Sequence, residues 1–135
     1  MNLNVLLSVR SSREHVVRES DTARAYGSGG VDVLATPALI ALIESAARDT
    51  VQHTLPPGHT TVGSFVKMHH LAPTPVGHTV RVDVCVMSIE GRRIMFDVRG
   101  YDSAGLIAEG EHERVVIDLA RFTTKAAERR GESSL

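Results

Sequence analysis

The residue that points most directly to chemistry is a glutamate within an apolar segment. Glu44 lies in residues 38–47, a run made mostly of leucine, isoleucine and alanine. Two interpretations are open. In the first, Glu44 is a boundary residue paired with Arg48 four positions later, a spacing that stabilises helices slightly. In the second, it is a half-buried carboxylate that acts as a nucleophile or a base. The rest of the chain has to decide between them.

Glu44 belongs to the one long helix that the sequence predicts, from about residue 37 to residue 54. Thr36 suits the N-cap position, because its hydroxyl can accept a hydrogen bond from a free backbone N–H of the first turn. Pro37 suits the first helical position. Prolines and a glycine at 55–58 end the helix. The apolar residues that recur at helical spacing are Leu39, Leu42, Ile43, Ala46 and Ala47.

A histidine follows on the next predicted element, a strand over residues 60–72. Alternation divides this strand into two faces. The face with apolar Val66 and Met68 is the one expected to cover the helix, because Lys67 on the other face belongs in water. His70, and not His69, is therefore predicted to point toward the helix. The full helix-side set is Val62, Ser64, Val66, Met68, His70 and Ala72.

The remaining segments predict an antiparallel sheet. A valine-rich strand over 78–88 turns at Glu90-Gly91 into a second apolar strand, and a second hairpin at 102–105 leads to a last strand over 106–119 with a bulge near Gly110. Before the helix, residues 3–18 are weakly strand-like, with a short strand at 15–18. Residues 19–31 read as a mobile, glycine-rich connection. The predicted class is α+β, with about five antiparallel strands wrapped around one helix.

Composition excludes several classes of protein. The chain has 135 residues and a net charge of −1 with scattered Lys and Arg, which gives no footprint for nucleic acid. Neither a membrane-spanning run nor a signal peptide is recognisable, so a cytoplasmic location is expected. The single cysteine, Cys85, excludes an internal disulfide, and the seven histidines have no zinc-site spacing. We expect one domain over 1–120 and a charged, flexible tail over 121–135.

With these elements in order, the chain resembles the fluoroacetyl-CoA thioesterase-like family, which has the hot-dog fold. The resemblance runs from about residue 16 to residue 122. It rests on separated blocks in the same order, which are far more specific together than any one alone. These blocks are Val33-Leu34-Ala35-Thr36, Glu44, Gly63, residues 70–77, residues 90–93 and residues 112–117.

The resemblance implies hydrolysis of a short acyl-CoA thioester to a free acid and CoA. It places the catalytic threonine, glutamate and histidine on Thr36, Glu44 and His70. It puts Gly63 near the acyl group and Arg114 among the substrate-binding residues. No metal and no cofactor beyond the CoA of the substrate are implied. The resemblance also implies a homodimer whose active sites lie at the interface between subunits.

These roles are chemically coherent. Thr36 at a helix N-terminus lies where free N–H groups and the helix dipole stabilise an oxyanion. Glu44 can attack the thioester carbon or activate a water, and both routes remain open. His70 can orient Glu44 or protonate the leaving thiolate.

Each residue also has a purely structural interpretation. Thr36 can simply cap the helix, His70 can be a satisfied histidine at a strand end, and Gly63 can serve close packing. Arg114 reads as a surface or structural cation, with a contact to a CoA phosphate as the functional alternative. The other histidines considered are expected to be solvated or structural, namely His53, His59, His69 and His112.

One segment departs from the family pattern. The enzyme that gives the family its name carries aromatic residues just before the helix as a lid, whereas this chain has glycine-rich residues 27–31 with only Tyr26 nearby. A broader acyl range than fluoroacetyl is therefore expected. Two further functions stay open, a non-catalytic acyl-CoA-binding or sensing module and an enoyl-CoA hydratase-like enzyme. An acyl-carrier protein in place of CoA also stays open.

Overall fold

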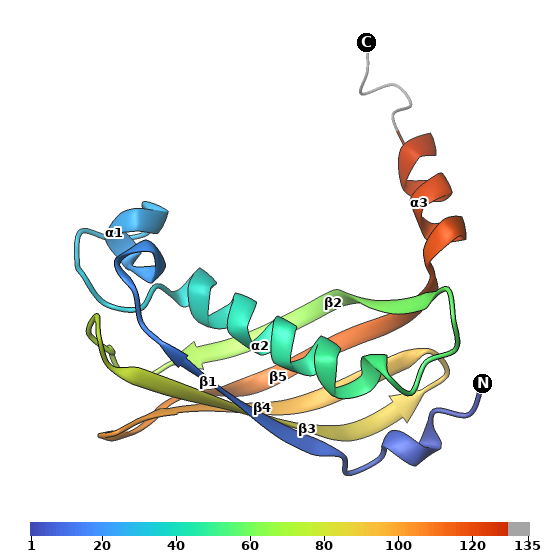
Figure 1. Ribbon diagram of the computed structural model, residues 1–135, viewed down its shortest axis with the longest axis horizontal. Helices are drawn as coiled ribbons and strands as arrows, with labels where there is room; N and C mark the ends of the chain where they lie inside the picture. The colour runs from blue at the N-terminus through green and yellow to red at the C-terminus, as the bar shows by residue number, and fades with distance from the viewer. Residues whose placement is uncertain (130–135) are drawn as a thin grey trace.

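A computed structural model, which describes residues 1–129, shows a five-stranded antiparallel sheet curved around one long helix (Figure 1). The α+β class and the predicted order of elements are confirmed. The strands lie in the order β1-β3-β4-β5-β2. The main elements are β1 (Arg10–Val16), α2 (Thr36–Gln52), β2 (His59–His70), β3 (Thr79–Glu90), β4 (Arg93–Asp102) and β5 (Gly105–Asp118).

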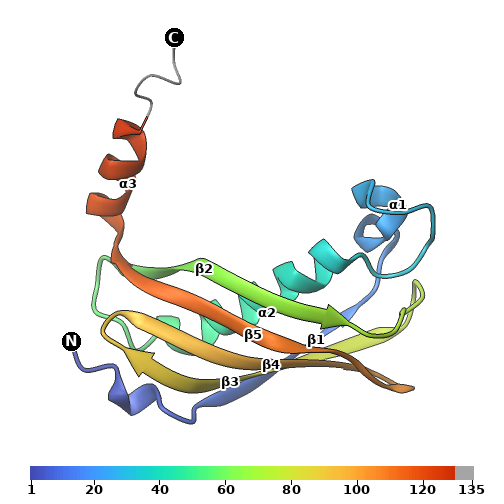
Figure 2. The same ribbon diagram turned by 180° about the vertical axis from the view of Figure 1, so that it is seen from behind.

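The core lies between α2 and the concave face of the sheet (Figure 2). From α2, Leu39, Ile43 and Ala47 are fully buried. The predicted valine stripe of β3 and the apolar face of β4 are buried as well, and they are Val80, Val82, Val84, Val86, Ile94, Phe96 and Val98. Removing such side chains from water is the main source of stability in a domain of this kind.

The edge strand β2 carries a bulge that changes which residues face the helix. Its pairing with β5 shifts between Gly63 and Phe65, so Ser64 is the extra residue. Beyond the bulge, Val66, Met68 and His70 face α2 as predicted. Before it, the residues that face α2 are Thr61 and Gly63, and the predicted placement of Val62 and Ser64 on that face is wrong. The physical reason is that one extra residue reverses the alternation of a strand.

The segment before α2 is folded over residues 19–26, where the prediction of a mobile connection is wrong, while the glycine-rich residues 27–31 are exposed and form no helix or strand. It contains a 3₁₀ turn, η2 (Glu19–Asp21), and a short helix, α1 (Ala23–Tyr26). Thr22 is buried and its hydroxyl accepts a hydrogen bond from the Ala25 N–H at 3.1 Å. Backbone hydrogen bonds join this segment to residues 33 and 35, directly ahead of α2.

The N-terminal strand differs from the prediction too. β1 begins at Arg10 and ends at Val16, and residues before it form a 3₁₀ turn, η1 (Asn4–Leu6). Pairing with residues 79–85 of the valine strand β3 makes β1 longer than its own weak alternation predicts.

In the C-terminal half, the bulge predicted near Gly110 is wrong in position. The β4–β5 register shifts at Ile107 instead, between the pairs Gly100–Ala108 and Tyr101–Leu106. Gly110 lies in regular pairing, where its lack of a side chain admits the Lys67 carbonyl. Residues after β5 form a helix, α3 (Leu119–Glu128), longer than the helical turn expected there (Figure 1). The end of the predicted tail, 130–135, lies outside the described residues.

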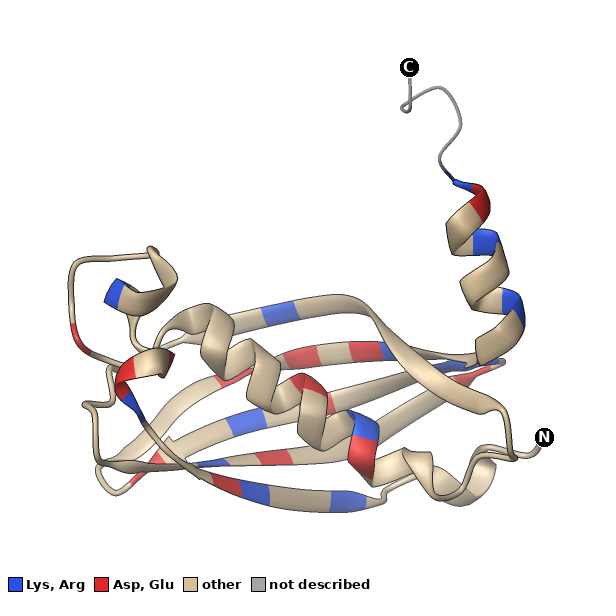
Figure 3. Ribbon diagram, turned by 45° about the horizontal axis from the view of Figure 1, so that its top comes forward, with Lys and Arg blue, Asp and Glu red and all other residues tan. Residues whose placement is uncertain are grey.

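Acidic and basic residues are interspersed along the strands (Figure 3). Two neighbouring pairs on β3 and β4 are Arg81 with Asp83 at 3.0 Å and Arg99 with Asp97 at 3.8 Å. Among residues 1–129, no helix has both the length and the apolar character needed to cross a membrane.

Candidate active site

Thr36 and His70 are brought together at one end of the fold. Thr36 is the first residue of α2, and the N-cap is Ala35, so the prediction that Thr36 caps the helix is wrong. Its hydroxyl turns away from the helix backbone, and Oγ1 lies 2.8 Å from Nδ1 of His70 at the end of β2. The side chain that could have capped the helix is therefore committed to the histidine.

Burial favours the neutral form of the His70 imidazole, and one of its two nitrogens has no hydrogen-bond partner among residues 1–129. Burial lowers the pKa of His70 below its ordinary value. Its Nε2 atom is buried and finds no hydrogen-bond partner among residues 1–129. Such an atom is what a substrate or a water would satisfy. Thr36, His70 and Ser28 line a hollow of about 260 Å³ at this point.

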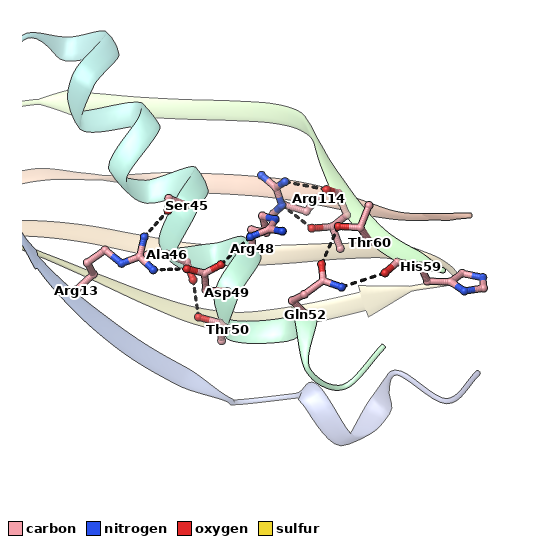
Figure 4. Close-up of polar contacts among 11 residues, drawn as sticks. Arg13, Ser45, Ala46, Arg48, Asp49, Thr50, Gln52, His59, Thr60 and Arg114 are labelled. Atoms are coloured by element: carbon pink, nitrogen blue, oxygen red, sulfur yellow. Dashed lines mark hydrogen bonds and ion pairs between the residues drawn. The ribbon is translucent and has the colours of Figure 1, made fainter. Parts of the chain in front are cut away.

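Glu44 lies about two turns beyond Thr36 on α2, and it is not paired with Arg48. Arg48 instead contacts Asp49 at 3.0 Å, and Asp49 is also bound by Arg13 of β1 (Figure 4). The Glu44 Oε2 atom lies 3.5 Å from Nη1 of Arg114. With 44% of its side chain exposed, Glu44 combines access to solvent with contact to a buried cation.

Gly63 provides the space that the Glu44 carboxylate occupies. A Cβ atom placed on Gly63 would collide with Oε2 of Glu44 and would press against His112. The absence of a side chain at Gly63 therefore leaves the space that the Glu44 carboxylate fills. Glu44 and Gly63 line a second hollow of about 280 Å³, together with Ser64, Phe65, Val66 and His112.

Arg114 is buried, so its interpretation as a surface cation is wrong. Its side chain is only 7% exposed. Nε donates to the Thr61 hydroxyl at 2.7 Å, and Nη2 donates to the Thr61 carbonyl at 2.9 Å. The guanidinium is thereby fixed beside Glu44.

His112 is the site residue that the sequence analysis did not single out. It is 1% exposed, which fits the structural role allowed for it but not a solvated one. It lies on β5 two residues before Arg114, and alternation puts both on the helix side. The two-residue spacing of His112 and Arg114 on one strand is the sequence feature that could have placed His112 at the site.

Within one chain the predicted residues form two separate groups and not one triad. Thr36 and Glu44 are eight residues apart on α2, which is about 12 Å along a helix axis. His70 and Gly63 are separated by roughly 20 Å of extended strand. Thr36 with His70 lies at one end, and Glu44 with Gly63 and Arg114 lies further along. In the described part of the chain, no group of three or more His, Cys, Asp or Glu side chains could hold a metal ion.

Residues 17–120 match the model of the fluoroacetyl-CoA-specific thioesterase family. The chain belongs to this family. A curated member, the fluoroacetyl-CoA thioesterase of Streptantibioticus cattleyicolor, is 36% identical over 98 residues, which cover 73% of this chain and 70% of that protein. The sequence-based resemblance is confirmed.

Solved structures agree with this assignment. The fluoroacetyl-CoA thioesterase FlK superposes with a TM-score of 0.86 at 32% identity, over 91% of this chain and 96% of its own. A hot-dog-like protein from Thermanaerovibrio acidaminovorans gives 0.90 at 28% identity, over 97% and 98%. A thioesterase superfamily member from Thermus thermophilus gives 0.84 at 30% identity, over 98% and 97%. The family and its structural neighbours share the hot-dog fold.

Proposed function

We propose that the protein is an acyl-CoA thioesterase that hydrolyses a short acyl-CoA to the free acid and CoA. The observation that carries this proposal is the Thr36–His70 contact at the N-terminus of α2, with a carboxylate available on the same helix. Membership of the thioesterase family supports it. The catalytic residues are Thr36, Glu44 and His70. No metal or separate cofactor takes part, and the enzyme acts in the cytoplasm.

The active unit is a homodimer with its sites between subunits. The support is that β2 is an edge strand, paired only with β5 among residues 1–129, and that Phe65 and Val66 on it are exposed. A two-fold axis near residues 66–67 would pair the β2 strands antiparallel. It would then bring His70 of one subunit beside Gly63 and Glu44 of the other, and the two hollows would merge.

In the joined site each group has a distinct task. The free N–H groups at the start of α2 stabilise the oxyanion that develops on the thioester carbonyl. Glu44 either bonds to the carbonyl carbon as the C–S bond breaks, or takes a proton from the attacking water. Because the Thr36 hydroxyl donates a hydrogen bond to Nδ1, neutral His70 carries its proton on Nε2, and this proton passes to the CoA thiolate. In the covalent route water then hydrolyses the mixed anhydride formed on Glu44. In both routes one proton of the water restores His70, and the products are the free acid and CoA–SH.

Free-thiol release from a panel of acyl-CoA esters tests the proposal. We expect wild type to hydrolyse at least one short ester, and Glu44→Gln and Glu44→Ala to abolish turnover while CoA binding persists. Glu111→Gln is the matched control, because Glu111 is an exposed carboxylate of β5. CoA binding without thiol release by wild type would favour the non-catalytic sensor. Water addition to an enoyl-CoA would favour a hydratase, and hydrolysis only of carrier-protein esters would make an acyl-carrier protein the carrier.

The acyl range is broader than fluoroacetyl alone. Its support is the segment over 27–31, whose Ser28 lines the Thr36–His70 hollow without adding an aromatic wall. A wall of small residues leaves room for larger acyl groups. Comparable kcat/KM values for acetyl-, propionyl- and fluoroacetyl-CoA are expected. A strong preference for fluoroacetyl-CoA over the rest would contradict this part of the proposal.

A further inference from the structure

We propose that His112 is a positioning residue, which fixes the Arg114 guanidinium so that one of its N–H groups holds the Glu44 carboxylate. This inference rests on the proposed function in one respect, because it takes Glu44 to be the reacting carboxylate. The positioning itself is a matter of hydrogen bonds on the concave face of the sheet. It uses a residue that neither the family pattern nor the sequence analysis assigns to the site.

The contacts of His112 determine its tautomer. Nδ1 lies 2.8 Å from the carbonyl oxygen of Phe65. A carbonyl oxygen can only accept, so Nδ1 must carry the proton. In a neutral imidazole the other nitrogen, Nε2, then has a lone pair. Nη1 of Arg114 lies 3.3 Å from Nε2 and donates to it.

The contacts of Arg114 show what this hydrogen bond adds. Nε and Nη2 are both committed to Thr61, which anchors one side of the guanidinium. The remaining nitrogen, Nη1, lies between two partners, His112 Nε2 at 3.3 Å and Glu44 Oε2 at 3.5 Å. Its hydrogen bond to His112 sets the angle at which the guanidinium faces Glu44. Because the guanidinium is planar, hydrogen bonds at its other N–H groups fix the direction of the N–H that faces Glu44.

The surroundings of His112 keep the ring in place and uncharged. The Phe96 ring stacks on it with centroids 6.2 Å apart and planes 25° apart. Burial is the largest cause of its lowered pKa, and the charge of Arg114 adds to the effect. The Phe65 carbonyl and the charges of Glu44 and Glu113 oppose it. Protonation would remove the acceptor at Nε2 and set a second cation against Arg114.

A double-mutant cycle separates positioning from mere core packing. His112→Phe keeps a flat ring beside Phe96 but has neither donor nor acceptor. If His112 acts through Arg114, this change should lower kcat by up to roughly 100-fold with little change in KM, because small misplacements of reacting groups have large effects. In an Arg114→Gln background the same change should lower kcat no further. His112→Gln, which keeps an amide acceptor, should restore part of kcat.

Two results would overturn the proposal: an unchanged kcat in His112→Phe, or an equal fall in both backgrounds for protein shown to be folded. Imidazole ¹⁵N shifts of the intact wild-type protein supply a measurement that needs neither turnover nor the Phe variant. A proton on Nδ1 is expected, and a proton on Nε2 would contradict the proposal. If wild type shows the expected tautomer yet hydrolyses no acyl-CoA, the proposed function fails while the positioning stands.

Discussion

Thr36 Oγ1 and His70 Nδ1, from residues 34 positions apart, lie 2.8 Å from each other where α2 begins and β2 ends. One nitrogen of the imidazole is thus oriented by a hydroxyl, and the other is buried without a partner among residues 1–129. A proton-transfer group oriented by a second side chain is a common arrangement in acyl transfer.

Removing only the hydroxyl of Thr36 tests whether this contact serves catalysis. Thr36→Val keeps the shape of the side chain but leaves His70 Nδ1 unpaired. We expect kcat to fall on the order of 100-fold or more, as for other positioned proton-transfer groups, while stability falls by only about 1 kcal/mol. Thr36→Ser, which keeps the hydroxyl, is the control and should retain most of the activity. Full activity in the valine variant would reduce Thr36 to a structural residue.

Gly63→Ala should separate stability from activity. The added Cβ collides with Oε2 of Glu44, which is the far end of a flexible side chain and can move away. We expect the free energy of unfolding to change by no more than about 1 kcal/mol. Turnover should fall by up to roughly 100-fold because the carboxylate loses its seat.

Gly100→Ala is the contrasting variant for this experiment. Its Cβ would meet Ile107 and Ala108 in the core, at 3.3 and 3.4 Å, and not the site. Urea unfolding should show a loss of stability, whereas kcat of the folded enzyme should persist. If Gly63→Ala behaves in the same way, Gly63 serves packing alone.

Stability should increase with pH across the range in which histidine titrates. The pKa values of His70 and His112 are both lowered from 6.5, mainly by burial. As pH falls from about 6.5 toward the folded-state values, the unfolded chain takes up protons that the folded chain does not, so unfolding becomes easier. The free energy of unfolding cannot change by more than about 1.4 kcal/mol per pH unit for each histidine.

Urea unfolding at several pH values between about 5 and 8 measures this slope. Above the range, the contribution of the two histidines should be constant. His112→Gln removes one of the two groups and should flatten the curve. A stability that falls with rising pH in this window would contradict the burial argument for both residues.

Val66→Glu should split the proposed dimer. Val66 is 40% exposed on the edge strand, close to the inferred two-fold axis, where two added carboxylates would repel each other. We expect sedimentation to give a monomer mass and thiol release to be lost, because neither subunit then holds a complete site. Met87 on β3 is 54% exposed, and Met87→Glu is the control. It should leave the dimer mass and the rate of thiol release unchanged. A monomer that hydrolyses acyl-CoA at the normal rate would show that one chain holds the whole site.

Local periodicity is enough to predict the long helix, its apolar face and the valine-rich strands. Leu39 and Ile43 recur at helical spacing and are buried in α2, and His70 has the helix-side position that alternation predicts beyond the bulge. The family blocks supplied the candidate residues at the site. The family match confirms the resemblance, while the catalytic roles stay predictions.

How those residues combine depends on contacts between distant parts of the chain. Glu44 meets Arg114 across 70 positions, and local spacing predicted Arg48 as its partner instead. One extra residue at Ser64 turned Gly63 toward Glu44 and Val62 away, which simple alternation does not foresee. Burial of Arg114 and His112 depends on strands paired from distant parts of the chain. Periodicity is a property of neighbours in sequence, whereas hydrogen-bond partners and bulges depend on contacts that exist only once the sheet has formed.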